Sequence, residues 1–319
     1  MPIGLKYGIL LVAMRFLGRH VVEFFGSKPS HDAEVAHWNE VEQRVSNGER
    51  LFWLNHPRIA HHYYRKALIE GLSWREWVVR ELDGPAAIAM ELGCGNGDAL
   101  KETLLLGTAV SGIGIDLDVS RFTAEHASRT DIRFVAADLN TVELDPNSSD
   151  LIYALQSFHH FEALEHVMEQ VNSALTDRGL FVLDEFVGPA RFQWTDLQLS
   201  IISQMLGLLP KSLRMYTNGV EKRAEGRSTP EEVIRVCPSE AVRSDEIVPL
   251  FYRYFDVVYH RNLGGTIQHL LYSGIVHNFA DNDAEIDHLV DCIDGLESTL
   301  IERGVLPSDF VLLIGRKKS

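Results

Sequence analysis

Three glycines at alternate positions, Gly93, Gly95 and Gly97, follow a short apolar run and the acidic residue Glu91. A buried run that is bounded by glycines is typical of a strand that ends in a tight turn. Because glycine has no side chain, the backbone of such a turn can approach a ligand closely. Residues 98–106 have helical composition. The segment therefore predicts a strand, a glycine-rich loop and a helix, the first half of a nucleotide-binding unit.

Polar side chains follow each of the next four apolar runs, 110–115, 132–137, 150–155 and 179–183. They are Asp116, Asp138, the pair His159 and His160, and the pair Asp184 and Glu185. The first of these carboxylates lies about 20 residues after the loop, where nucleotide-binding folds hold a ribose diol. Open parallel sheets bind ligands at the carboxyl ends of their strands. We therefore expect these side chains to gather around one ligand.

The same motifs carry a family resemblance. The segments concerned are Glu91–Gly97, Gly114–Leu117, Ala137–Leu139, Phe158–His160 and the turn Arg178–Leu180. They resemble the successive motifs of class I S-adenosylmethionine-dependent methyltransferases, and the resemblance covers about residues 84–188. The stretches 184–196, 238–244 and 264–266 resemble a bacterial branch that acts on small molecules. The resemblance implies a seven-stranded Rossmann-like α/β sheet whose last strand is antiparallel.

The resemblance also implies which residues contact S-adenosylmethionine. The three glycines would admit its methionine part, Asp116 would accept hydrogen bonds from both ribose hydroxyls, and Asp138 would accept one from the adenine amine. Leu117 would lie against the adenine. The cofactor's amino group would be held by Glu91 and by the backbone near 154–156. The full expected set is Glu91, Gly93, Cys94, Gly95, Gly97, Asp116, Leu117, Asp138, Leu139, Ala154 and Gln156.

Two other functions remain as alternatives. An NAD-dependent oxidoreductase expects a third glycine three residues after the second, but Asp98 stands there and Gly97 comes one residue earlier. Glu91 also suits a cofactor with an ammonium group better than a pyrophosphate. A non-catalytic cofactor-binding partner of another subunit is the second alternative, and the intact loop and both acidic residues argue against it.

The catalytic candidates are His159, His160 and Glu185. A sulfonium cofactor carries a good leaving group, so the enzyme mainly aligns the reacting atoms for in-line displacement. A general base is needed only if the nucleophile must lose a proton. Either histidine could take that proton, with Glu185 orienting it. A thioether acceptor would need no base.

The acceptor is expected to be a small molecule that is methylated on O, N, S or C. An aromatic-rich N-terminal segment disfavours a protein acceptor. Candidate acceptor contacts are Tyr64, Arg191, Trp194, Tyr216, Arg243, His260 and His269. An arginine among them would suit a carboxylate or phosphate. Three widely spaced cysteines and the adjacent pair His61 and His62 show no metal-ligand spacing, so no metal is expected.

The pattern divides the chain into four regions. Residues 1–82 form a helical cap, 83–188 the cofactor-binding core, 189–250 a helical insertion, and 251–319 the completion of the sheet by strands at 255–260 and 310–315. The insertion overhangs the ligand edge and would act as a lid, as a dimer contact, or as both.

Bulk composition excludes some partners. The formal net charge of −15 over 319 residues argues against binding to nucleic acid. Cysteine usage and the lack of a signal peptide predict a cytoplasmic protein. The apolar segment 5–25 is interrupted by charges and too short to span a bilayer. It would pack on the domain or at a homodimer interface, or lie on a membrane surface.

Overall fold

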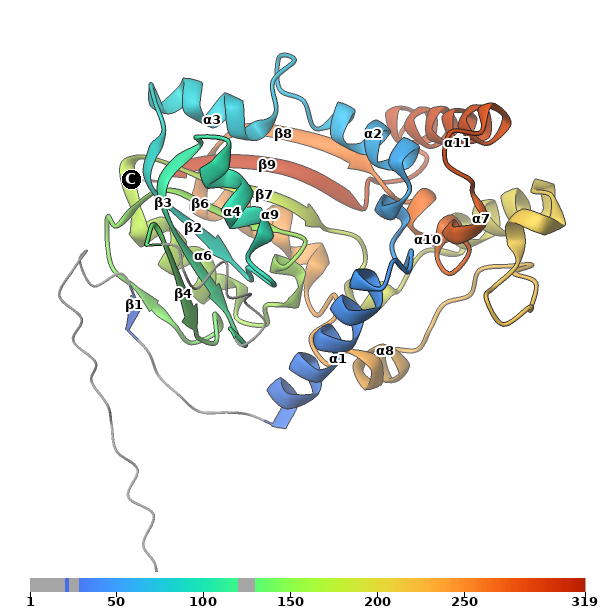
Figure 1. Ribbon diagram of the computed structural model, residues 1–319, viewed down its shortest axis with the longest axis horizontal. Coiled ribbons are helices and arrows are strands. Elements are labelled where there is room, and N and C mark those ends of the chain that lie inside the picture. Colours follow the sequence, from blue (N-terminus) through green and yellow to red (C-terminus); the bar gives the residue numbers. More distant parts are fainter. Residues whose placement is uncertain (1–20, 23–28, 120–129, 319) are drawn as a thin grey trace, which may run out of the picture.

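A seven-stranded sheet forms the centre of the computed structural model, which describes residues 21–22, 29–119 and 130–318 (Figure 1). The strand order is β4-β3-β2-β6-β7-β9-β8. The bounds are β2 (Ala86–Leu92), β3 (Ala109–Asp116), β4 (Ile132–Ala136), β6 (Ser149–Leu155), β7 (Leu175–Phe186), β8 (Phe255–Gly264) and β9 (Phe310–Lys317). Each lies on a run that the sequence analysis expected to be a strand.

Strand direction sets the edge at which ligands bind. Strands β2, β3, β4, β6 and β7 pair in parallel, whereas β9 pairs antiparallel with both β7 and β8. The predicted fold class, a Rossmann-like sheet with an antiparallel last strand, is therefore confirmed. After β2, the chain adds β3 and β4 on one side of that strand and then adds β6 and the later strands on its other side. Its switch point lies at the carboxyl end of β2, where the glycine loop begins.

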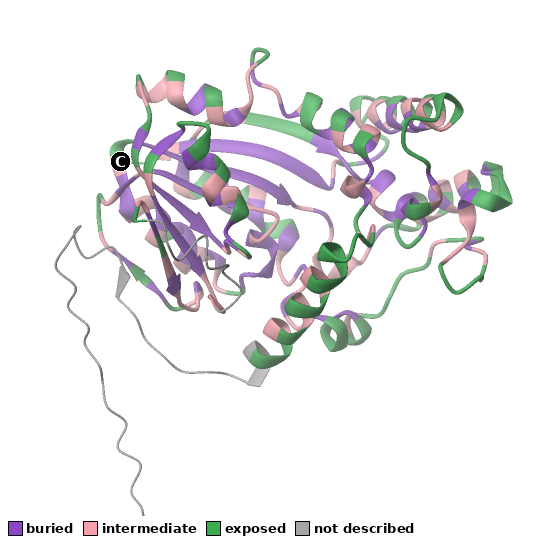
Figure 2. Cartoon of the chain, in the orientation of Figure 1, coloured by how far each residue is buried: buried purple, intermediate pink, exposed green. Residues whose placement is uncertain are grey.

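Helices cover both faces of the sheet because alternate strand residues face opposite sides. In β9, for example, Leu312 and Ile314 join one apolar core, and Val311 and Leu313 join the other. Figure 2 shows the inner strands buried, and the edge strand β8 and the outer sides of the helices largely exposed. The helix bounds are α1 (Pro29–Ser46), α2 (Pro57–Lys66), α3 (Trp74–Leu82), α4 (Asp98–Leu105), α6 (Leu164–Ala174), α7 (Asp196–Leu208), α8 (Pro230–Val236), α9 (Ile247–Tyr254), α10 (Gln268–Tyr272) and α11 (Ala284–Glu302).

The two cores use different helices. Residues of α2, α3, α4, α7, α10 and α11 join the first core, and residues of α6 and α9 join the second. Local sequence explains where several helices begin. Ser73 and Glu76 form a reciprocal capping box at α3, and Thr229 and Glu232 form one at α8. Such boxes satisfy backbone N–H groups that the first turn of a helix leaves unpaired.

The expected insertion, residues 189–250, is distributed over the molecule. Helix α7 packs against α10, whereas α9 packs against α6 and β8. Only the segment after α8 reaches the ligand edge, where Pro238 and Ser239 line a cavity.

Most of the apolar segment 5–25 lies outside the described residues, so its expected packing is not tested. Within it, the two-residue strand β1 (Val21–Val22) pairs with β5 (Glu143–Leu144). Among the described helices, none is long and apolar enough to cross a membrane.

Candidate active site at the carboxyl edge of the sheet

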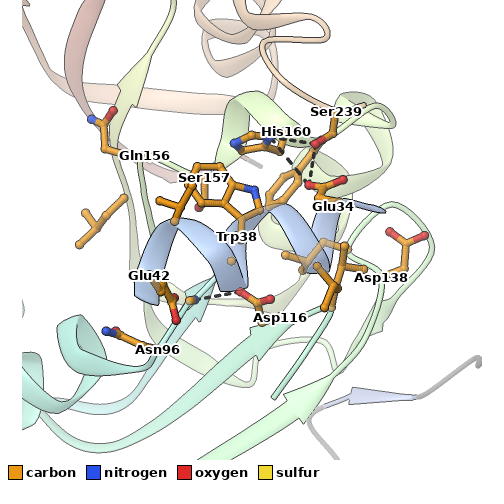
Figure 3. Close-up of a pocket in the computed structure, with 18 of the residues that line it drawn as sticks. Glu34, Trp38, Glu42, Asn96, Asp116, Asp138, Gln156, Ser157, His160 and Ser239 are labelled. Carbon is orange, nitrogen blue, oxygen red and sulfur yellow. Dashed lines mark hydrogen bonds and ion pairs between the residues drawn. The ribbon is translucent and has the colours of Figure 1, made fainter. Parts of the chain in front are cut away.

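A cavity of about 650 Å³ lies at the carboxyl ends of the parallel strands (Figure 3). Its wall is built from the glycine loop, the residues that follow β3, β4 and β6, one side of α1, and the segment after α8. Small-molecule sites in proteins usually enclose about 300–1,000 Å³. The predicted strand ends therefore do meet at one ligand-sized space.

The glycine loop forms the floor of this cavity near β2. Gly93 has a φ of +67°, and a Cβ built there would lie 2.6 Å from Cβ of Ser157. Gly95 has a φ of +53°, and its N–H donates to Oδ2 of Asp116 at 2.8 Å. Backbone of this kind favours glycine, and the missing side chain at Gly93 leaves room for a neighbouring strand end.

Two carboxylates stand at the ends of β3 and β4, both on the cavity wall. Asp116 accepts hydrogen bonds from the N–H groups of Gly95 and Asp118, at 2.8 and 3.3 Å. Asp138 uses Oδ1 to accept from the backbone and side-chain nitrogens of Asn140, each at 2.9 Å. A carboxylate has about four lone-pair sites. Both side chains therefore bring acceptor oxygens to the cavity wall.

The expected cofactor residues divide into two groups. Those on the wall are Gly93, Gly95, Asp116, Leu117, Asp138, Leu139 and Gln156. Glu91, Cys94, Gly97 and Ala154 are not among the described wall residues. Glu91 is buried behind the loop and accepts a hydrogen bond from Tyr153 at 3.3 Å. Burial raises the pKa of Glu91 to about 8, which favours its neutral form.

Gln156 joins the wall to the buried end of β7. Its backbone has a φ of +54°, and its side-chain nitrogen donates to Oδ1 of Asp184 at 3.0 Å. The Tyr63 hydroxyl donates to the same carboxylate oxygen at 2.5 Å. Burial raises the pKa of Asp184 to about 6, although these two donors oppose the shift. This network fixes the strand end and leaves Asp184 itself off the described wall.

His159 lies behind the wall, with both ring nitrogens facing carboxylates. Nδ1 lies 2.5 Å from Oε1 of Glu185, and Nε2 lies 3.4 Å from Oε1 of Glu240. Burial alone would lower the pKa of His159, but the two carboxylates more than offset it and raise the pKa to about 10. A histidine held in this way is not placed to take a proton from a molecule in the cavity.

Glu185 is a fully buried carboxylate that organises the turn after β6. Its oxygens accept from the backbone N–H groups of Ser157 at 2.9 Å, Phe158 at 2.5 Å and Phe186 at 2.6 Å, besides contacting His159. Several backbone donors stabilise a buried carboxylate. Glu185 therefore positions the two histidines and does not touch the cavity.

His160 is the member of the histidine pair that lines the cavity. Its Nδ1 lies 2.8 Å from the hydroxyl of Ser239, which donates to Glu34 at 2.5 Å. Because the hydroxyl donates its proton to Glu34, it accepts a hydrogen bond from Nδ1–H of His160. The neutral ring therefore carries its proton on Nδ1, and Nε2 is unprotonated. Burial, with His159 nearby, lowers the pKa of His160 to about 3 and keeps the ring neutral.

Helix α1 supplies a whole side of the wall that the sequence analysis missed. Glu34, Trp38 and Glu42 face the cavity in Figure 3. The rings of Trp38 and His160 meet edge to face with centroids 5.3 Å apart. The aromatic content of this region was a visible signal, but the acceptor contact expected in the N-terminal segment was Tyr64 of the next helix. Asn140, Ser157 and Ser239 were also missed, although each adjoins a predicted motif.

The candidate acceptor contacts lie elsewhere among the described residues. None of Tyr64, Arg191, Trp194, Tyr216, Arg243, His260 and His269 is on the cavity wall. Arg243 forms ion pairs with Glu165 and Glu246, and burial places His269 in an aromatic cluster and lowers its pKa to about 4. For the four candidates within the insertion, the reason is that most of the insertion packs along the sheet and only the segment after α8 reaches the ligand edge.

Arg191 has an indirect connection to the cavity. Its guanidinium donates to the main-chain oxygens of Pro238 and Glu240, at 2.7 and 3.0 Å. These bonds hold the segment that carries Ser239 against the histidine pair. Arg191 therefore positions the wall and is not available to an acceptor's anionic group.

Comparison with known proteins gives one family match. Residues 90–183 match the methyltransferase domain family. No curated protein sequence matches the chain. Three similar solved structures have identities below 20% and TM-scores below 0.5, values too low to transfer a substrate or a mechanism.

The first of these structures is an S-adenosylmethionine-dependent methyltransferase from Mesorhizobium loti, at 19% identity and a TM-score of 0.43, covering 76% of this chain and 95% of that one. The second is geranyl diphosphate methyltransferase in complex with SAM, at 13% identity and 0.44, covering 76% and 84%. The third is a methyltransferase in complex with the Haloferax volcanii Trm112 methyltransferase activator, at 14% and 0.43, covering 92% and 100%.

The matched segment includes the glycine loop, both strand-end carboxylates and the histidine pair, on a sheet with the strand order described above. Residues 90–183 therefore form a methyltransferase domain, and they lie on the Rossmann-like sheet described above.

Proposed function

We propose that this enzyme transfers the methyl group of S-adenosylmethionine to a small molecule bound in the same cavity. One observation carries this proposal. A single space of about 650 Å³ is lined on one side by the glycine loop, Asp116 and Asp138, and on the other by Trp38, His160 and Ser239. The first side has the chemistry to hold a nucleoside, and the second has an aromatic ring and polar groups for an acceptor.

The residues present fit the cofactor. A Cβ at Gly95 would meet only Oε1 of Glu42, at 3.8 Å, so the loop leaves room there for close approach of a ligand. Asp116 would accept from ribose hydroxyls, and Asp138 from an exocyclic amine. When bound, S-adenosylmethionine supplies a methyl group on a positively charged sulfur. The sulfur would leave in line with the attacking atom, as a neutral thioether.

The charge of the wall also restricts the charge of the acceptor. Among the described wall residues are six carboxylate side chains and no lysine or arginine. The six are Glu34, Glu42, Asp98, Asp116, Asp138 and Glu162. Burying an anionic group beside several carboxylates costs free energy because like charges repel. We therefore propose a neutral or cationic acceptor, in place of the carboxylate or phosphate compound that the arginine candidates suggested.

No general base is assigned. His159 has both nitrogens occupied by carboxylates, and His160 directs Nδ1 to Ser239. These residues instead help to align the acceptor with the methyl group. Glu185 fixes the turn that carries both histidines, and His160 with Trp38 forms the part of the wall that an acceptor would contact. Proximity and orientation are the main requirements for transfer from a sulfonium leaving group.

Cofactor affinity tests the proposal directly. Calorimetry should show binding of S-adenosylhomocysteine and none of NADH. Asp116→Asn should weaken S-adenosylhomocysteine binding by at least about tenfold, since hydrogen bonds to a charged acceptor contribute roughly 1.5–3 kcal/mol. Asp177→Asn, an exposed aspartate on β7, is the matched control and should leave the affinity unchanged.

Binding of NADH without binding of the thioether product would replace the proposal with the oxidoreductase alternative. The acceptor itself is sought with a metabolite library and methyl-labelled cofactor, in which neutral and amine compounds should be labelled in preference to acids. Full turnover by Asp116→Asn would exclude the role given to Asp116. Cofactor binding with no labelled product would favour the non-catalytic partner subunit.

A further inference from the structure

A cluster of metal-ligating side chains lies directly behind the acceptor side of the cavity. His159 and His160 come from the turn after β6, and Glu240 comes from the segment after α8. Each offers one ligand atom, and these three atoms lie within 4.8 Å of one another. Both histidines are buried, and Glu240 is largely buried, with 16% of its side chain exposed.

The spacing matches that of a coordinated ion. His159 Nε2 and Glu240 Oε1 are 3.4 Å apart, longer than a good N–H···O hydrogen bond. Two ligand atoms that are each about 2.0–2.1 Å from a tetrahedral zinc ion are roughly 3.3 Å apart. The pair is therefore separated by the distance that a shared metal ion would impose.

The Nδ1 atom of each imidazole already has an oxygen partner. Nδ1 of His159 contacts the Glu185 carboxylate at 2.5 Å, and Nδ1 of His160 contacts the Ser239 hydroxyl at 2.8 Å. Metal-binding histidines almost always have their other nitrogen held by a carboxylate, a carbonyl or a similar oxygen, which orients the ring and selects its tautomer. Both rings are held in this way, which leaves their Nε2 atoms as the ligand atoms.

An independent observation comes from His160. Its Nε2 is buried and has no hydrogen-bond partner among the described residues, and the residue is 9% exposed. Figure 3 shows one ring nitrogen of His160 directed at Ser239 and the other turned away from it. Buried polar atoms without partners are rare and indicate a bound water or ion. The tautomer inferred above leaves a lone pair on this nitrogen, which is what a metal ion requires.

The surrounding charge also favours a cation. Three carboxylates, those of Glu34, Glu185 and Glu240, contact the two histidines or face them at 3.8 Å or less. Positive or titratable groups that act on the histidines or Glu240 are Arg191, His37 and His269. Arg191 donates to main-chain oxygens of the segment, and burial keeps His269 neutral. Protonated His159 balances one of these charges when no ion is bound, and a metal ion would displace its Nε2 proton and take over this role.

We propose that His159 Nε2, His160 Nε2 and the carboxylate of Glu240 bind one divalent transition-metal ion. Two imidazoles with one carboxylate are the donor set of catalytic zinc sites that keep an open position, and of iron(II) facial triads. Zinc is the ion we test first.

A second donor set shares His160 but is already occupied. Glu34, His160 and Cys237 also offer ligand atoms within 4.8 Å of one another. The Ser239 hydroxyl, however, lies between them, at 2.5 Å from Glu34, 2.8 Å from His160 and 3.8 Å from Cys237. This hydroxyl fills the position that an ion would take. The structure therefore favours the set with Glu240, and the two sets make different predictions.

Metal titration of the full chain distinguishes them. Protein without a histidine tag is stripped with a chelator and titrated with Zn²⁺ by calorimetry, in the absence of any cofactor. We expect one ion per chain, at least about tenfold weaker binding for Glu240→Gln, and unchanged binding for Cys237→Ser. Cys292→Ser is included as a control, because Cys292 lies 3.7 Å from His288 on the surface of α11 and could bind zinc adventitiously.

Cobalt provides a spectroscopic readout that does not depend on activity. Co²⁺ bound by nitrogen and oxygen ligands should show visible absorption bands without a thiolate charge-transfer band, and Glu240→Gln should weaken them. No binding by the wild-type chain, or binding that is lost in Cys237→Ser or Cys292→Ser and kept in Glu240→Gln, would overturn the assignment. Circular dichroism and S-adenosylhomocysteine binding check that each variant is folded. Because the metal titration contains no cofactor, its failure would leave the proposed methyl transfer standing.

Discussion

At the scale of single residues, the site depends on backbone positions that only small or strained residues can occupy. Gly93 is the clearest case, since its φ is positive and a Cβ would overlap Ser157. Gln156, by contrast, adopts a φ of +54° with a full side chain and is held there by Asp184. Strain of this kind persists where surrounding contacts fix the conformation. Both positions border the cavity, which is where strained backbone is often found in proteins.

Gly93→Ala should destabilise the protein and weaken S-adenosylhomocysteine binding. A left-handed alanine costs about 1–2 kcal/mol, and the overlap with Ser157 adds roughly 1–3 kcal/mol. Gly107→Ala is the matched control, because Gly107 has a φ of +72° but open space around it. Urea unfolding should show the larger loss for Gly93→Ala. Equal losses would mean that the contact with Ser157 contributes nothing.

At the scale of elements, helix α1 closes the cavity from outside the central sheet. It meets the rest of the wall through the Glu34–Ser239 hydrogen bond and the contact of Trp38 with His160 (Figure 3). Its outer side is exposed, and no other described helix supplies comparable residues to the wall. A helix with few buried contacts opens at a low free-energy cost. We therefore expect a ligand in the cavity to stabilise α1 more than other helices.

Hydrogen exchange tests this expectation. Adding S-adenosylhomocysteine should slow amide exchange in α1 several-fold, because the ligand contacts Trp38 and Glu42 across the cavity. Helix α11 lies away from the cavity and serves as the internal control, with no change expected. Slower exchange in both helices alike would indicate global stabilisation, and no change in α1 would show that α1 does not close over the ligand.

At the scale of the whole molecule, the inserted helix α7 is tied to the last strand by a buried polar group. Asp309 precedes β9 and accepts hydrogen bonds from Gln198 at 2.9 Å and Trp194 at 3.3 Å. Its other oxygen is buried with no hydrogen-bond partner among the described residues. Burial raises the pKa of Asp309 from 3.8 to about 7, even though both donors oppose the shift. At pH values between these two, the folded state therefore keeps a proton on Asp309 that the unfolded chain has lost.

This difference makes stability depend on pH. Between the unfolded pKa of about 3.9 and the folded pKa, the folded state binds more protons, so the free energy of unfolding falls as pH rises. The penalty is complete above the folded pKa of about 7. Asp309→Asn removes the ionisation and should stabilise the protein at pH 8 relative to pH 5, by on the order of 1–4 kcal/mol. Urea unfolding at both pH values measures this, with Asp177→Asn as the control. If Asp309→Asn changed the free energy of unfolding equally at both pH values, the ionisation assigned to Asp309 would be contradicted.

The sequence by itself determined the sheet and the cofactor side of the site. The glycine loop, Asp116 and Asp138 are local signals, because a parallel strand that ends in a turn places its next residue at the ligand edge whatever the rest of the chain does. Seven apolar runs could therefore be placed as strands, and seven of the expected cofactor residues line the cavity.

Only the tertiary structure decided the acceptor side. Glu34, Trp38, Ser239 and Glu240 are far from His160 in sequence and meet it through the packing of α1 and of the segment after α8. The arginine candidates lie elsewhere because Arg191 and Arg243 are held by contacts with other segments, and His269 is buried in an aromatic cluster. Adjacent histidines show no metal-ligand spacing until a third group from another segment is packed against them. Long-range contacts of this kind depend on side-chain packing in three dimensions, which local periodicity does not encode.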